Sequence, residues 1–259
     1  MSRVVWLNDG LVDPATAGLS IDDPGVRFGA GLFETMRSQD GAVPWLDRHL
    51  DRLARSISAL ELDPTPPIAQ VRRAALHVAA TLPTGSARVR VTVTPHPTLV
   101  VEGTPVEVDP DMTLTAATVR AAWHPNRAIA EHKTLSFLGW RDAQRRARAT
   151  GADIALLLDA DGRLGEASSA NVFCVIGDEL VTAPARGLLP GVTRRIVMDL
   201  AAAHEAILDE HVWRAADEMF VTSAVRGIVP IVRCDDAPVG HGVGPMTRSL
   251  RGQVNALLT

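Results

Sequence analysis

The chain has 259 residues, of which 46% are hydrophobic, and a formal net charge of −4 at pH 7. This length suffices for one large domain or two small ones with hydrophobic cores, and the slight negative charge gives no reason to expect nucleic-acid or membrane binding. The sequence contains no apolar stretch of about 18 residues and no secretion-signal pattern. The only cysteines, Cys174 and Cys234, form no metal-like pair, so we expect a cytoplasmic protein in a reducing compartment.

The first part of the chain predicts strands mixed with amphipathic helices. Asn8-Asp9-Gly10 is a hairpin turn signal. Residues 28–37 contain two glycines, which indicates a close approach of another backbone segment before the chain continues as a strand. Apolar residues recur at helical spacing over 46–60. The expected elements are strands over 3–8, the end of 28–37, 88–93 and about 112–119, and helices over 46–60 and 67–82.

The second part of the chain follows a candidate linker, residues 121–130, which contains His124-Pro125-Asn126. We therefore expect an N-terminal α+β domain over 1–120 and a C-terminal domain over 131–259. The elements expected in the second domain are strands over 153–158, 170–176, 179–182, 218–222 and 228–233, and helices over 139–150, 191–204 and 244–257.

One compositional feature points to chemistry. The chain has 25 arginines, a single lysine, Lys133, and no tyrosine. Arginine can replace lysine at most solvated positions, but not where an amine must lose its proton and attack a carbonyl, because guanidinium stays protonated. A lysine that persists alone is a candidate for forming a Schiff base. The alternative is that one surface lysine survived by chance.

Several motifs around this lysine occur in a distinctive order. They are residues 28–35 (FGAGLFET), 132–138 (HKTLSFL), 151–159 (GADIALLLD), 165–173 (GEASSANVF), 189–194 (LPGVTR), and 218–224 (EMFVTSA) with 227–230 (GIVP). Together they resemble the class IV aminotransferase family, the fold-type IV enzymes that use pyridoxal 5'-phosphate (PLP). The resemblance covers nearly the whole chain. It implies an α+β fold with a smaller N-terminal α/β domain, a larger C-terminal α/β domain with a pseudo-barrel core, and a homodimer.

The resemblance also implies site residues. Lys133 matches the lysine that holds the cofactor's aldehyde and moves a proton. Glu166 matches the carboxylate beside the pyridine nitrogen, where a negative charge keeps that nitrogen protonated. Thr193 follows Gly191 at the start of a predicted helix, and a helix N-terminus attracts anions. The residues expected to bind the cofactor are Arg52, Lys133, Glu166, Val192, Thr193, Ser223 and Ala224.

The chain departs from the family's pattern in three places. Phe137 stands near the position where many relatives carry a tyrosine that contacts the cofactor's phenolic oxygen. Ala224 stands where relatives often have a hydroxyl residue, so only its N–H could contact the phosphate. Ala30 replaces the aspartate in the first motif, a change to which we attach little weight.

Three arginines are candidates for binding a substrate carboxylate. Arg27 precedes the first glycine turn, Arg90 lies on an expected strand, and Arg186 lies in the loop before Gly191. Arginine grips carboxylates through two parallel hydrogen bonds. The alternative for each is an ordinary surface arginine, in a chain that uses arginine everywhere.

The expected function is amino-group transfer between an amino acid, with D-alanine or D-glutamate favoured, and a 2-oxo acid by a ping-pong Schiff-base mechanism. One alternative is an aminodeoxychorismate lyase, which releases pyruvate and 4-aminobenzoate. Others are a branched-chain L-amino-acid or (R)-amine transaminase and a catalytically silent binding module, although the presence of both Lys133 and Glu166 argues against the last. The histidines have no metal-ligand spacing, so no metal is expected.

Overall fold

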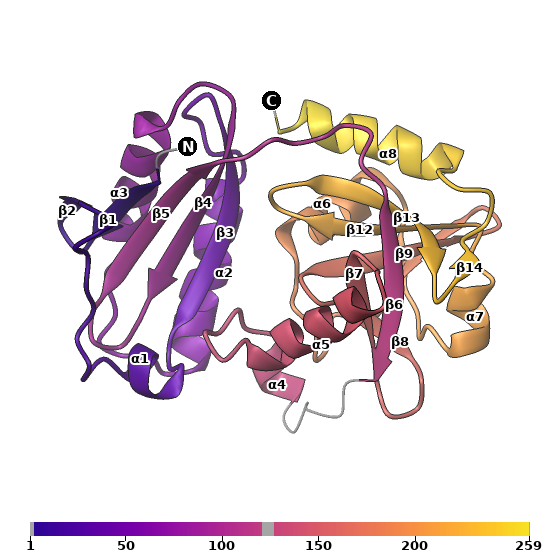
Figure 1. Ribbon diagram of the computed structural model, residues 1–259, viewed down its shortest axis with the longest axis horizontal. Helices are drawn as coiled ribbons and strands as arrows, with labels where there is room; N and C mark the ends of the chain where they lie inside the picture. The colour runs from indigo at the N-terminus through magenta and orange to yellow at the C-terminus, as the bar shows by residue number, and fades with distance from the viewer. Residues whose placement is uncertain (1–2, 121–126, 259) are drawn as a thin grey trace. The chain divides into compact units, whose positions relative to one another are not determined.

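The computed structural model describes residues 3–120 and 127–258, and its chain forms two compact units (Figure 1). The first unit runs to Val108 and also includes His132–Ser136 and Leu258. The second comprises Asp109–Glu131 and Phe137–Leu257. Among the described residues, no helix has the length and apolar character needed to cross a bilayer.

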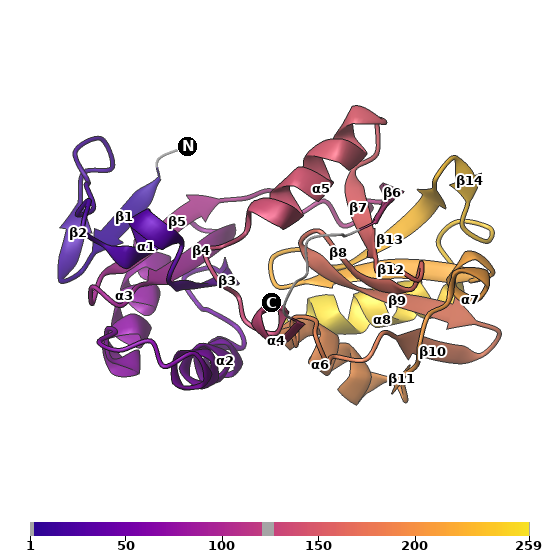
Figure 2. The ribbon, with the colours of Figure 1, turned by 90° about the horizontal axis from the view of Figure 1, so that it is seen from below.

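The first unit is an antiparallel sheet covered by helices on one face (Figures 1 and 2). Its strand order is β2-β1-β5-β4-β3. Apolar residues of α2 and α3 pack against alternate residues of β3, β4 and β5 and form the core. The elements are β1 (Val4–Leu7), β2 (Gly10–Val12), α1 (Pro24–Phe28), β3 (Leu32–Gln39), α2 (Leu46–Ala59), α3 (Ile68–Thr81), β4 (Ser86–Val93) and β5 (Leu99–Pro105).

The segment around Lys133 covers the start of edge strand β3. The Lys133 carbonyl accepts a hydrogen bond from the Phe33 N–H at 2.8 Å, and the Leu135 N–H donates to the Gly31 carbonyl at 2.9 Å. A Cβ at Gly31 would collide with the Leu135 side chain, and one at Gly29 would lie 2.8 Å from Ser136 Oγ. The two glycines of the first motif therefore permit the close backbone approach that the sequence predicted.

The second unit contains a closed barrel. Six strands pair in the cyclic order β9-β12-β13-β6-β7-β8, and β8 returns to β9. This barrel is the pseudo-barrel core that the family resemblance implied. The interior is apolar. The barrel strands are β6 (Leu114–Arg120), β7 (Ile154–Leu158), β8 (Leu164–Ala167), β9 (Ala170–Ile176), β12 (Glu218–Ser223) and β13 (Gly227–Cys234).

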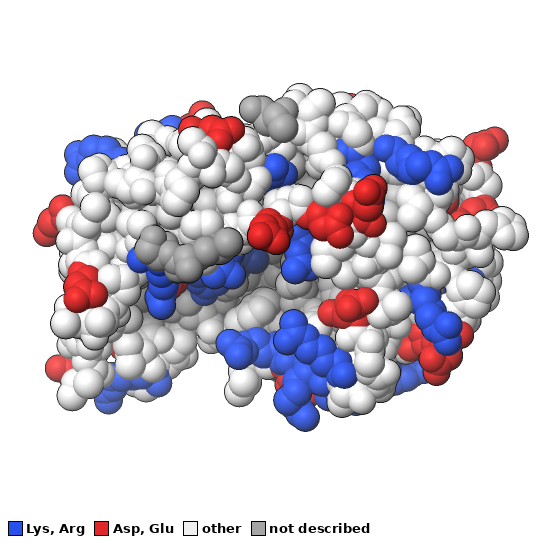
Figure 3. Space-filling model, turned by 45° about the horizontal axis from the view of Figure 1, so that its top comes forward, with Lys and Arg blue, Asp and Glu red and all other residues white. Residues whose placement is uncertain are grey.

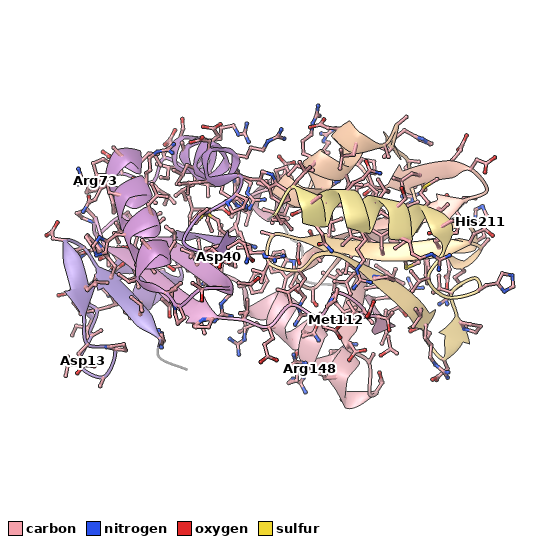
Figure 4. All side chains as sticks on the ribbon, turned by 90° about the horizontal axis from the view of Figure 1, so that it is seen from above. Asp13, Asp40, Arg73, Met112, Arg148 and His211 are labelled. Carbon is pink, nitrogen blue, oxygen red and sulfur yellow. The ribbon has the colours of Figure 1, made fainter. Side chains whose placement is uncertain are left out.

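Helices cover the outside of this barrel. α5 packs on β6 and β7, and both α6 and α8 pack on β12; Figure 4 shows α8 lying across the strands. The remaining elements of this unit are α4 (Arg127–Ala130), α5 (Leu138–Ala149), β10 (Glu179–Thr182), α6 (Val192–Leu200), β11 (His204–Glu205), α7 (Glu210–Arg214), β14 (Ala237–Pro238) and α8 (Pro245–Ala256).

The division between the units differs from the predicted boundary at residue 120. β6 belongs to the second unit because it pairs in parallel with both β13 and β7, and such long-range pairing leaves no local signal in the sequence. The Lys133 segment, expected in the C-terminal domain, belongs to the first unit through its bonds to β3. The predicted linker falls largely on 121–126, which lie outside the described residues.

Candidate active site

Lys133 is held by its backbone and lies beside an aromatic ring. Its Nζ is 4.5 Å from the centroid of the Phe33 ring, and its side chain is partly buried. The Nδ1 of the neighbouring His132 and the Ser56 Oγ are hydrogen-bonded at 2.9 Å, which ties the segment to α2. The position of the lysine is thus fixed on two sides, by β3 and by α2.

Arg52 belongs to a buried charged cluster on the face of α2 that meets β3. Its Nε and Nη2 donate to the two oxygens of Glu34 at 2.8 and 2.7 Å, a two-pronged ion pair. His49 Nδ1 lies 2.8 Å from Glu34 Oε2. All three side chains are buried, and their spacing on α2 (residues 49, 52 and then Ser56) follows one helix face.

The cluster shifts the protonation of its members. Burial alone would raise the pKa of the Glu34 carboxyl, but Arg52 and His49 outweigh it and hold that pKa well below its usual range. Burial lowers the pKa of His49, and the positive charges of Arg52 and Lys133 lower it further, against the opposing effect of Glu34. His49 is therefore neutral near pH 7 and donates its Nδ1–H to the carboxylate.

Glu166 lies on β8 in the second unit and is 5% exposed. Its Oε1 accepts a hydrogen bond from Trp140 Nε1 on α5 at 2.9 Å. The Trp140 ring stacks on Phe137, with centroids 5.2 Å apart and an angle of 1° between the planes. The aromatic residue at the tyrosine position of relatives thus contacts the tryptophan that holds the glutamate.

Asn171 lies between Glu166 and the turn that begins α6. Across the sheet it pairs with Glu166 on β8 and with Thr222 on β12. Opposed residues of antiparallel strands point to the same face, so the three form a row on the outside of the barrel. Asn171 Nδ2 also donates to the Leu189 carbonyl at 2.9 Å, and a Cβ at Gly191 would collide with Asn171 Oδ1. The row therefore reaches the turn before α6.

The start of α6 has the features of an anion site. Gly191 is the N-cap, and no side chain in the described parts of the chain caps this helix. Val192 and Thr193 follow it and are both buried. The Thr193 Oγ1 is inaccessible to solvent and has no hydrogen-bond partner. An uncapped helix N-terminus with an unpartnered hydroxyl favours a negatively charged group.

Ser223 and Ala224 end β12 and begin the turn to β13. Ser223 pairs with Gly227 at the base of this turn, and its Oγ lies 3.4 Å from the Arg226 N–H. Ser223 follows Thr222 directly, so the backbone of the turn continues from the barrel row. Both residues are partly exposed.

The predicted substrate arginines differ in their surroundings. The Arg90 guanidinium lies 3.7 Å from the centroid of the Phe33 ring, the same ring that Lys133 contacts. Burial lowers the pKa of Arg90, and the nearby Glu102 opposes this effect. Arg27 is exposed and lies over the Phe28 ring at 5.1 Å, and Arg186 is exposed. The structure therefore brings Arg90 beside the Phe33 ring that Lys133 contacts.

One face of the molecule carries no single continuous basic patch. On the face drawn in Figure 3, uncharged and acidic side chains divide the basic ones into several small groups. Within residues 3–120 and 127–258, no set of three or more histidine, cysteine or acidic side chains is arranged to hold a metal ion.

Sequence reasoning missed four residues around these sites: Glu34, His49, Trp140 and Asn171. The spacing of His49 and Arg52 on one helix face was visible, but Glu34 gave no separate signal because it lies in a strand. Trp140 follows Phe137 at helical spacing in a chain without tyrosine, and this pattern could have marked it. Asn171 lay inside a quoted motif but received no role.

Comparison with known proteins agrees with this architecture. The model of the family "Amino-transferase class IV" matches residues 31–234. The chain therefore belongs to the class IV aminotransferase family, whose members depend on PLP.

Two relatives and one solved structure illustrate the proteins to which the chain is similar. The chain is 30% identical to branched-chain-amino-acid aminotransferase-like protein 2 of Arabidopsis thaliana over 98% of its own length, but it spans only 50% of that protein. It is 27% identical to D-alanine aminotransferase of Staphylococcus haemolyticus, covering 97% of this chain and 96% of the relative. A fold IV-transaminase from Curtobacterium pusillum superposes with a TM-score of 0.86 at 25% identity, covering 100% and 99% of the two chains.

Proposed function

We propose that this protein is a PLP-dependent aminotransferase that moves an amino group between an amino acid and a 2-oxo acid. The observation that carries the proposal is the buried, unpartnered Thr193 hydroxyl at the uncapped start of α6. Asn171 connects this anion site to Glu166 on the same face of the barrel. A cofactor with a phosphate at one end and a pyridine nitrogen at the other fits that pair of groups.

In this proposal the cofactor, when bound, withdraws electrons from the substrate carbon through its protonated ring. Glu166 would hold the ring nitrogen, and Trp140 orients the carboxylate by donating a hydrogen bond to its Oε1. The N–H groups of Val192 and Thr193, the Thr193 hydroxyl and the Ser223–Ala224 backbone bind the phosphate. Arg52 supplies positive charge to the same phosphate, with Glu34 fixing the orientation of its guanidinium.

Lys133 has two tasks in the proposed reaction. Its amine would hold the cofactor covalently, and the same amine, when free, would carry the proton to and from the substrate carbon. The chain's other basic groups cannot perform the first task, since arginine stays protonated. Arg90 shares the Phe33 ring with Lys133 and is proposed to bind the substrate carboxylate.

We propose D-amino acids, with D-alanine and D-glutamate first, as the amino donors. The Arg90 guanidinium would bind the common carboxylate, and Arg27 or Arg186 would be needed only for a second one. Similarity to D-alanine aminotransferase of Staphylococcus haemolyticus over nearly the full length of both chains supports this choice. Branched-chain L-amino acids are the second candidate, supported by the similarity to the Arabidopsis thaliana relative.

We also propose that the protein is a homodimer. Four of the exposed large apolar side chains in the first unit lie within residues 19–28, from 46% exposed for Leu19 to 81% for Ile21, with Val26 and Phe28 between these values. Exposed apolar side chains that form a large surface patch mark interaction sites, and we propose that these four contribute to the dimer interface. Light scattering tests the assembly: the wild-type protein should have twice the mass of the chain, and Ile21→Asp with Phe28→Asp should halve it.

The first test of function is the absorbance spectrum of the protein reconstituted with PLP. The wild type should have a visible-range band that borohydride removes, and Lys133→Arg, which keeps the positive charge, should lack the band. Adding D-alanine or D-glutamate should convert the band to that of the aminated cofactor. Conversion by L-leucine alone would favour the branched-chain substrate, and a band that answers to neither would favour the lyase. A protein that cannot be reconstituted would disprove the proposal.

The carboxylate role of Arg90 has a matched control on the same strand. Arg90→Ala should reduce kcat/KM for D-alanine by about 10-fold or more, because a hydrogen-bonded charge partner is lost. Arg88→Ala removes an exposed arginine two residues away and should change it little. Equal effects of the two substitutions would remove Arg90 from the site.

A further inference from the structure

Thr222 has a buried hydroxyl that the protein itself leaves unsatisfied. The residue is 2% exposed, and its Oγ1 is one of five buried side-chain polar atoms in the described parts of the chain that have no hydrogen-bond partner. A second of the five is Thr193 Oγ1. Buried polar groups are nearly always hydrogen-bonded, so each exception needs an explanation.

The fold brings the Thr222 side chain to the start of α6. Thr222 is paired with Asn171, so both side chains lie on the outer face of the barrel with Cβ atoms about 5 Å apart. Asn171 in turn contacts the Leu189–Gly191 turn that begins α6. α6 packs on β12. The buried residues of α6 begin with Val192 and Thr193, and Ile196 and Val197 follow one turn after Thr193.

The row also gives the hydroxyl a suitable distance from Glu166. Glu166, Asn171 and Thr222 occupy three adjacent strands, so Thr222 lies two strand spacings, roughly 10 Å, from Glu166. A ligand whose ring nitrogen meets Glu166 would therefore carry its phosphate toward Thr222 and the helix N-terminus. Ala224, two residues further on, has no hydroxyl to offer that phosphate.

We propose that the Thr222 hydroxyl is a direct donor to the cofactor phosphate and takes over the hydrogen bond that Ala224 cannot make. The proposal rests on the proposed PLP-dependent function. Two threonine hydroxyls, Thr193 from the helix and Thr222 from the strand, would then close on the phosphate from two elements. Each hydroxyl gains on binding the partner that it lacks in the free protein.

The test compares Thr222→Val, which keeps the shape and removes the hydroxyl, with Thr222→Ser, which keeps the hydroxyl. Thr247→Val is the matched control, since Thr247 is a buried threonine with an unpartnered hydroxyl in the first turn of a different helix, α8. The dissociation constants of PLP and of pyridoxal, which has no phosphate, are measured by equilibrium dialysis of the apoprotein. The shift in unfolding temperature caused by inorganic phosphate is measured in parallel.

Thr222→Val should weaken PLP binding by about 10-fold or more, because a hydrogen bond to a charged group is lost. It should leave pyridoxal binding unchanged and reduce the stabilisation by inorganic phosphate. The dissociation constants of PLP for Thr222→Ser and Thr247→Val should stay within about 3-fold of the wild-type value.

Three outcomes would overturn the proposal. If Thr222→Val binds PLP as tightly as the wild type, the hydroxyl does not contact the phosphate, while the proposed function stands. If PLP and pyridoxal binding weaken equally, the substitution has disturbed the pocket and no phosphate contact is lost. If the wild type forms no borohydride-sensitive band with PLP, the proposed function and this proposal fail together.

Discussion

The Glu34 cluster of the first unit and the Thr193 and Thr222 hydroxyls of the second unit are buried polar groups of opposite kinds. In the first unit, Glu34 is bonded to Arg52 and His49, so the carboxylate is fully engaged inside the protein. In the second unit, the hydroxyls of Thr193 and Thr222 are buried without a partner. A paired cluster stabilises a rigid geometry before any ligand arrives, whereas an unpaired hydroxyl costs free energy until a ligand satisfies it.

This difference indicates a division of tasks. The first unit fixes the directions of charged groups, including the arginine proposed to bind phosphate. In the second unit, the Thr193 and Thr222 hydroxyls have no partner in the protein and are available to bind a ligand. Substitution of a paired group and substitution of an unpaired hydroxyl should therefore change the stability of the ligand-free protein in opposite directions.

Arg52→Met should have the largest effect. It leaves the Glu34 carboxylate buried beside a neutral histidine, and breaking a buried ion pair in this way costs about 3–5 kcal/mol. Urea denaturation of the apoprotein measures the loss. Arg55→Met, an exposed position on the same helix, should stay within about 0.5 kcal/mol of the wild type. Adding Glu34→Leu to Arg52→Met should recover much of the loss; no recovery would show that the pair is not the cause.

The pH dependence of stability should report His49. The folded-state pKa of His49 lies below its ordinary value of 6.5. Just below pH 6.5, His49 therefore binds a proton in the unfolded chain but not in the folded chain. The free energy of unfolding should therefore fall as pH drops from 6.5 to 5, by up to about 1.4 kcal/mol per pH unit from this residue. The low pKa of Glu34 adds a further loss only below its ordinary value of 4.5.

His49→Gln should flatten this slope between pH 5 and 6.5, since the amide can still donate to Glu34 but does not titrate. Denaturation curves at several pH values measure the slope for each protein. His241→Gln, at an exposed position, serves as the control. An unchanged slope in His49→Gln would mean that another group takes up the proton.

Trp140 sharpens the comparison, because it pairs with Glu166, a buried carboxylate of the second unit. Trp140→Phe keeps a ring to stack on Phe137 and removes the N–H that holds Glu166. A double-mutant cycle with Glu166→Ala should give a coupling energy of about 1–2 kcal/mol. The same cycle with Trp213→Phe, whose indole nitrogen has no partner, should give a value near zero. Equal coupling in both cycles would contradict the pairing.

The smallest effect should have the opposite sign. Thr193→Val removes an unsatisfied buried hydroxyl, so the apoprotein should become more stable by about 0.5–1 kcal/mol. Thr182→Val is the matched control: its hydroxyl donates to the Val172 carbonyl at 2.7 Å, so its loss should destabilise the protein by about 1 kcal/mol. Both values come from urea denaturation. A destabilised Thr193→Val would mean that the hydroxyl is satisfied in solution.

The sequence singles out a residue where one residue type has no substitute, and gives little signal where a contact joins distant elements. Lys133 stands out because no arginine could perform the chemistry proposed for it. Glu34 did not stand out, because its role depends on two hydrogen-bond partners, His49 and Arg52, on the helix that follows it. Thr222 lies within the motif 218–224 that the sequence analysis identified. Only the structure reveals that its buried hydroxyl lacks a hydrogen-bond partner.

The fold followed the same rule. The long helices α2 and α3 were predicted within about two residues from their apolar periodicity. β5 was missed because Gly103 and Pro105 interrupt the strand pattern, and β8 because it has four residues. The barrel itself was expected only from the family resemblance, since closure between β8 and β9 is a pairing that local patterns do not encode.

The bonds between residues 133–135 and the start of β3 also have a consequence for solubility. β3 is mostly buried and lies at the edge of its sheet, and a bare apolar edge invites pairing with strands of other molecules. The lysine segment occupies part of that edge with its own backbone. A substitution that loosens this segment would therefore expose part of the β3 edge to other molecules. We expect changes that alter the reactivity of Lys133 in this way to increase aggregation as well.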